Sequence, residues 1–198
     1  GLKGGGKDPS SIEVPEATLR QPAERMRGGA QTAEERKARR RTNTEGMRRL
    51  NLAWIDQMCT TDHPLREKMS LFWHGHFACR VNEVRQNQLM LDVIRQHALG
   101  SFRDLLFGVS KSAAMLRFLN NQQNRKQHPY ENFGREVMEL FTMGRGNYTE
   151  KDVKEGSRAF TGWGYDQQGQ FVFRRRQHDE GVKTFLGKTG NFDGDDIL

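Results

Sequence analysis

Between residues 32 and 162, apolar side chains recur three and four positions apart, which predicts a succession of short helices. Thr61-Asp62-His63-Pro64 is a typical helix start, because proline is tolerated in the first helical turn. Thr149 and Asp152 predict another start by reciprocal capping. We expect the apolar faces to be buried in one helical core that contains Leu65, Met69, Phe72, Leu89, Val93, Leu116, Val137, Leu140 and Phe160.

Beyond these helices the apolar pattern changes from helical to alternating. Trp163 and Tyr165, then Phe171 and Phe173, alternate on either side of a Gln167-Gln168-Gly169 turn, which predicts a β-hairpin. The predicted fold class is therefore mainly α, a helical domain with a small β-hairpin appendage near the C-terminus.

The ends of the chain predict its organisation. Residues 1–31 carry Gly, Pro and polar residues without apolar periodicity, so we expect an extended or disordered lead-in. Residues 32–198 are expected to be part of a larger, mainly helical domain that is truncated at the C-terminus. This expectation rests on a start at Gly1 instead of Met and on a stop at Asp195-Asp196-Ile197-Leu198, which resembles a helix beginning. No window approaches the roughly 18 apolar residues of a membrane span.

Charge and cysteine content exclude some classes of function. The formal net charge is +7, but the excess lies largely in the first fifty residues. Glu34 and Glu35 interrupt this basic stretch and no aromatic side chains are interleaved for base stacking, so we expect no nucleic acid partner. Cys59 and Cys79 are too few for a disulfide framework, and neither lies in a His-paired nucleophile motif.

Two histidines among aromatic residues are the first candidates for chemistry. His74 and His76 lie within Phe72–Phe77 and are candidate metal ligands. Residues two positions apart on a regular helix point in nearly opposite directions. The imidazoles therefore converge only if the helix ends or unwinds near Gly75, or if both histidines lie on an extended segment. The alternative is one buried, hydrogen-bonded histidine and one histidine at a surface or interface.

Two glutamates three positions apart are the second candidates. Glu136 and Glu139 would project from one side of a helix, which suits acid–base catalysis or metal ligation. Structural ion pairs are the alternative, between Arg135 and Glu139, or between Glu136 and either Arg158 or Arg103.

His178-Asp179 follows the predicted hairpin and could bring a third imidazole to the same place. Ordinary turn residues are the alternative.

Two hypotheses about function remain. The first is a metal-assisted enzyme in which a divalent transition metal is held by histidines and glutamates act as catalytic groups. The second is a non-catalytic structural or partner-binding module whose His, Glu and Arg motifs lock helices together. The residues concerned are His74, His76, His178, Glu136 and Glu139.

Several longer motifs also carry a family resemblance, from about residue 45 to the C-terminus. They are Asn51–Met58, Pro64–Phe77, Glu131–Thr142, Tyr148–Val153, Arg158–Trp163 and His178–Gly187. In this order and spacing they resemble the bacterial domain-of-unknown-function 1800 family. The resemblance implies an uncharacterised protein that is exported to the periplasm or cell envelope, and a second exported protein, encoded nearby, as its partner. It implies no established activity.

The sequence departs from the family pattern at three places. Ser112-Ala113 stands where Asp-Pro is common, Asn120 where Asp is usual, and Tyr130 where Asn is usual. If those groups belong to a site in the family, we expect the site to be altered here.

Overall fold

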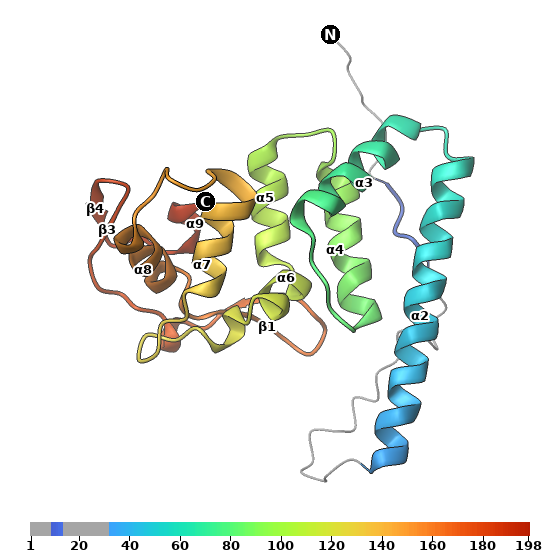
Figure 1. Ribbon diagram of the computed structural model, residues 1–198, viewed down its shortest axis with the longest axis horizontal. Helices are drawn as coiled ribbons and strands as arrows, with labels where there is room; N and C mark the ends of the chain where they lie inside the picture. The colour runs from blue at the N-terminus through green and yellow to red at the C-terminus, as the bar shows by residue number, and fades with distance from the viewer. Residues whose placement is uncertain (1–8, 14–31) are drawn as a thin grey trace.

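The computed structural model describes residues 9–13 and 32–198. These residues form mainly helices, together with two small antiparallel hairpins (Figure 1). The predicted fold class is confirmed. No helix in these two ranges is long and apolar enough to cross a membrane. The α-helices are α2 (Ala33–Thr60), α3 (Pro64–Phe77), α4 (Val84–His97), α5 (Phe102–Lys111), α6 (Ala113–Phe118), α7 (Asn132–Glu136), α8 (Glu150–Ala159) and α9 (Gly194–Ile197). The shorter turns are η2 (Asn121–Gln123), η3 (Val137–Thr142) and η4 (Arg175–Gln177), and the strands are β1 (Trp163–Tyr165), β2 (Phe171–Phe173), β3 (Lys183–Phe185) and β4 (Lys188–Gly190).

The long helix α2 lies at one edge of the molecule (Figure 1). Its second half packs on α3 and α4 through Leu50 and Trp54, which join Val84 and Leu91 in an apolar cluster. Ile12 is also buried in this cluster, although residues 9–13 form neither helix nor strand. The remainder of the expected lead-in, residues 1–8 and 14–31, lies outside the described residues.

The main core lies between α4, α5, α6, α7 and β1. Its centre is an aromatic group in which the Phe160 ring lies 4.9 Å from Phe133 and 5.1 Å from Trp163, both edge to face. Gly134 lets α7 approach α8 closely, because a Cβ atom there would lie 2.8 Å from Ser157 Oγ. The remaining members of the core are Phe77, Val81, Met90, Ile94, Leu105, Leu106, Val109, Ala114, Met115, Leu116, Leu119, Val137 and Phe141.

The predicted buried face of α3 is wrong. Leu65 and Phe72 are 56% and 58% exposed, whereas Glu67, Ser70 and Phe77 face the interior. The reason is that Glu67 has buried polar partners, so a charged residue occupies an inward position that an apolar pattern cannot identify.

Leu140 is also exposed, at 58%. Its helix changes into the π-helical segment η3, in which the Met143 backbone N–H bonds to the carbonyl of Met138, five positions earlier. This wider turn shifts the side chains that follow away from the α-helical phase. Of the other predicted core residues, Leu116, Val137 and Phe160 are buried, and Met69, Leu89 and Val93 are half-buried.

The predicted hairpin is confirmed, since β1 pairs with β2 through Trp163–Phe173 and Tyr165–Phe171. A second hairpin, β3–β4, was not predicted, because its only large apolar strand residue is Phe185. Phe185 packs with Met138 and Val153, which attaches this hairpin to α8 and η3.

Two leucines that were predicted to be equivalent provide a test of this core. Leu116→Ala should lower the free energy of unfolding by about 2–5 kcal/mol, because the deletion leaves a cavity among close-packed atoms. Leu140→Ala removes the same atoms from an exposed position and should change it by less than about 0.5 kcal/mol. Urea unfolding at one pH measures both values, and equal losses would contradict the assigned burial.

Candidate functional site

The two histidines of α3 are held apart because the helix continues without a break through Gly75 to Phe77. The ring of His74 lies 5.3 Å from the ring of Trp54 on α2. Although much of His74 remains accessible to solvent, partial burial lowers the pKa of its imidazole. His76 Nε2 donates to the carbonyl of Phe141 at 3.1 Å. Each histidine therefore fastens α3 to a different neighbour.

The two glutamates also have separate surroundings. Glu139 accepts hydrogen bonds from Arg145 and from the Tyr148 hydroxyl, and these bonds hold the pKa of its carboxyl below the usual range. Glu139 is therefore paired with Arg145, which was not the arginine named as its partner in the sequence analysis. Glu136 is half-buried and makes no hydrogen bond or ion pair within the described residues, although its charge acts on nearby Arg145.

The alternative pairing of Arg135 with Glu139 is not found. Arg135 donates two hydrogen bonds, each of 2.8 Å, to Glu150, and a weaker one of 3.2 Å to Glu131. Neither Arg158 nor Arg103 pairs with Glu136 in the described part of the chain.

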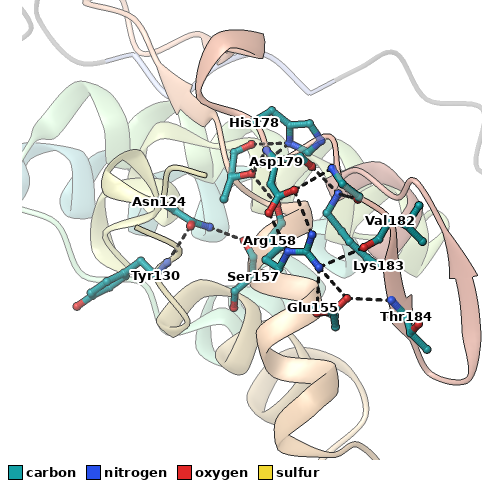
Figure 2. A network of polar contacts seen from close by, with 12 residues as sticks. Asn124, Tyr130, Glu155, Ser157, Arg158, His178, Asp179, Val182, Lys183 and Thr184 are labelled. Carbon is teal, nitrogen blue, oxygen red and sulfur yellow. Dashed lines mark hydrogen bonds and ion pairs between the residues drawn. The ribbon is translucent and has the colours of Figure 1, made fainter. Parts of the chain in front are cut away.

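Arg158 of α8 instead lies at the centre of a polar network with the segment that follows η4 (Figure 2). Its Nε and one terminal nitrogen donate to Asp179 at 2.8 and 3.2 Å, and its other terminal nitrogen donates to Glu155 at 3.0 Å. Glu155 in turn accepts the backbone N–H of Thr184 on β3 at 2.9 Å. The Arg158 hydrogen bonds hold the pKa of Asp179 below its usual value. The network therefore fastens the second hairpin to α8.

His178 is 6% exposed, and its orientation is fixed by Thr161. Its Nδ1 lies 2.9 Å from the Thr161 carbonyl and 3.3 Å from the Thr161 hydroxyl oxygen. Because a carbonyl only accepts, Nδ1 carries the proton, and Nε2 carries the lone pair when the ring is neutral. Nε2 has no hydrogen-bond partner in the described residues. It is not one of their polar atoms that are both fully buried and without a partner, so solvent reaches it.

Lys183 was not predicted as a functional residue, yet its side chain is almost completely buried. Its ammonium group donates to the carbonyls of Asp179 and Gly181, at 2.5 and 2.9 Å, which closes the turn between η4 and β3. Burial lowers the pKa of Lys183. The local sequence gives no signal for this burial, because the lysine begins a strand with only one large apolar residue.

A pocket of about 750 Å³ lies beside this network. One wall is η4 with His178, and the other is the turn that holds Lys126, whose backbone N–H bonds to the Gln177 carbonyl at 2.8 Å. This second wall was not predicted as functional. Its only sequence signal is an amide-rich stretch, Asn120–Asn124. The lining residues are Lys126, Gln127, Arg175, Arg176, His178, Asp179 and Glu180.

The candidate metal ligands His74, His76 and His178 are therefore not united with Glu136 and Glu139. Within residues 9–13 and 32–198, no group of three or more His, Cys, Asp or Glu side chains is arranged to hold a metal ion.

The cysteines add no candidate nucleophile. Burial raises the pKa of the half-buried Cys79 thiol to about 12, which keeps it protonated near neutral pH. Cys59 is an exposed free thiol on α2.

The Arg158–Asp179 pair should make stability dependent on pH. A carboxyl whose pKa is depressed by folding stabilises the protein fully above its unfolded pKa of about 4, and this contribution is lost as the pH falls through the lower folded value. Asp179→Asn should therefore differ most from the wild type at pH 7, and the difference should narrow below about pH 4. Urea unfolding at several pH values measures this, with exposed Asp56→Asn as the control. A difference that is constant with pH would contradict the pairing.

Comparison with known proteins adds the family. A family model described as "Protein of unknown function (DUF1800)" matches residues 7–198, which covers nearly all of the chain and confirms the resemblance found in its motifs. No curated protein and no solved structure matches the chain. The chain therefore belongs to the DUF1800 family of proteins of unknown function.

Proposed function

We propose that this chain is a non-catalytic structural and partner-binding module whose His, Glu and Arg motifs lock helices together. The observation that carries the proposal is the separation of the candidate residues. His76 fastens α3 to η3, Glu139 binds Arg145 and Tyr148, and His178 binds Thr161. A metal-assisted active site would require such groups to converge on one ion.

Charged side chains also join helices at positions other than the candidate histidines and glutamates. Glu67 of α3 and Arg95 of α4 are both 2% exposed and form a two-pronged ion pair, with the shortest contact at 2.7 Å. The indole N–H of Trp54 on α2 donates to the same carboxylate at 2.9 Å. Three helices are thus joined through one side chain, which is the arrangement that a structural role requires.

The partner-binding part rests on aromatic side chains at the surface. Phe72 and Phe102 are 58% and 40% exposed, and their rings lie 4.9 and 5.6 Å from the ring of half-buried Trp73. Contiguous exposed aromatic side chains are typical of surfaces that bind another protein. The second exported protein implied by the family resemblance, and a location outside the cytoplasm, belong to this proposal.

One observation favours the other candidate function, a metal-assisted enzyme. Glu136 has no hydrogen-bond partner in the described residues, and it immediately precedes the π-helical segment Val137–Thr142. Such segments are frequent at functional sites. Ligands from outside the described residues would then be required to complete a metal site.

Metal content separates the two candidates. Protein purified without chelator should contain no stoichiometric transition metal, and EDTA should leave its melting temperature unchanged, because no described group of side chains holds an ion. Mass spectrometry of the metals and thermal unfolding measure these outcomes. Stoichiometric metal that is lost from a His76→Ala, Glu136→Ala variant would overturn the proposal.

The locking role has its own test. Glu67→Gln should lower the free energy of unfolding by about 3–5 kcal/mol, because it leaves the buried Arg95 guanidinium without its counter-charge. Glu45→Gln is the matched control, since it breaks an exposed pair with Arg49 and should cost less than about 1 kcal/mol. Equal, small losses in both variants would remove the structural role assigned to Glu67.

A further inference from the structure

We propose that the pocket beside η4 is a binding site for a hydroxylated acid, a ligand that carries a carboxylate and hydroxyl groups, as a uronic acid does. The proposal goes beyond the function proposed above and needs only the pocket. It would stand whether or not the protein also binds a metal or another protein.

Unpaired cations supply the acid-binding part of the pocket. Lys126 and Arg176 line it, and neither forms an ion pair with any described residue. Arg175 lines it as well, but is paired with Glu180 at 2.9 Å. Two cations that line a shared pocket without an ion-pair partner among the described residues favour a carboxylate or a similar anion, because charge-assisted hydrogen bonds are the strongest contacts available there.

His178 supplies the part that recognises a hydroxyl group. Since its Nδ1–H donates to the Thr161 carbonyl, the Nε2 atom of the neutral ring can only accept. A bare carboxylate has no proton to donate to this acceptor, and it would leave Nε2 with only water as a donor. A ligand whose hydroxyl group lies near its acid group satisfies both the cations and the imidazole.

The size and remaining lining of the pocket fit a ligand of this class. Its volume of about 750 Å³ lies within the range of small-molecule sites, about 300–1,000 Å³, and exceeds the space that one carboxylate group fills. The Gln127 amide and two carboxylates, Asp179 paired with Arg158 and Glu180 paired with Arg175, add further acceptors along the wall. Acceptors interspersed with cations suit several hydroxyl groups beside one acid group.

The experiment is calorimetric titration of the full chain at pH 7.5 and low ionic strength with three probes. Glucuronate offers the acid and the hydroxyl groups, acetate only the acid, and glucose only the hydroxyl groups. Glucuronate should bind about ten-fold or more tightly than either of the others, because it alone satisfies both parts of the pocket.

Two variants test which residues recognise the acid group and which recognise the hydroxyl group. Lys126→Ala with Arg176→Ala should weaken glucuronate binding about ten-fold or more, whereas Lys37→Ala with Arg40→Ala, an equal change of charge on the exposed face of α2, should not. His178→Asn keeps a donor for the Thr161 carbonyl and removes Nε2, so the preference for glucuronate over acetate should disappear. Circular dichroism checks that each variant is folded.

Two results would overturn the proposal. One is equal affinity of the wild type for glucuronate and acetate, and the other is unchanged glucuronate affinity when Lys126 and Arg176 are both replaced. If His178→Asn does not fold, these two measurements decide the outcome without it.

Discussion

The buried ion pair between Glu67 and Arg95 is the interaction on which the arrangement of the first half of the protein depends. Two charges removed from water are tolerated only when their hydrogen-bonding groups are satisfied, and here Trp54 and the Ser10 carbonyl complete the set. The pair fixes the rotation of α3 about its own axis. That rotation places Phe77 in the core, turns Phe72 outward, and holds the histidines of α3 against different neighbours.

Arg158 has a corresponding role at the other end of the chain. It joins α8 to the segment after η4 through the Asp179 carboxylate and the Val182 carbonyl. Glu155, on α8 itself, pairs with Arg158 and accepts the backbone N–H of Thr184. The aromatic core of Phe133, Phe160 and Trp163 is held by edge-to-face ring contacts, and the Lys111 ammonium group lies 5.3 Å from the Trp163 ring. Charged side chains thus set the orientation of elements, while apolar burial supplies most of the driving force for folding.

Features that depend on neighbours within a few residues could be predicted from the sequence. Proline at the start of α3, the Thr149–Asp152 capping box and the β1–β2 hairpin are of this kind. Features that depend on a distant partner could not be predicted. Glu67 faces inward because of an arginine 28 positions away, and Leu140 faces outward because η3 adopts i to i+5 hydrogen bonding. The candidate histidines and glutamates were identified as polar residues in apolar segments, but the pattern could not show which partner each would find.

Buried amide side chains order the segment between α6 and α7, in which the short turn η2 is the regular element. Asn124 is 1% exposed, donates to the Ser157 carbonyl and to Asn121, and accepts the backbone N–H of Tyr130. These bonds replace those that a helix or strand would supply, so the wall of the pocket is ordered before any ligand arrives. Ordering one backbone residue costs about 1–2 kcal/mol in conformational entropy. A ligand that bound there would be spared that cost for the wall, but binding would still cost its own translational and rotational freedom and the entropy of the long side chains that it immobilises.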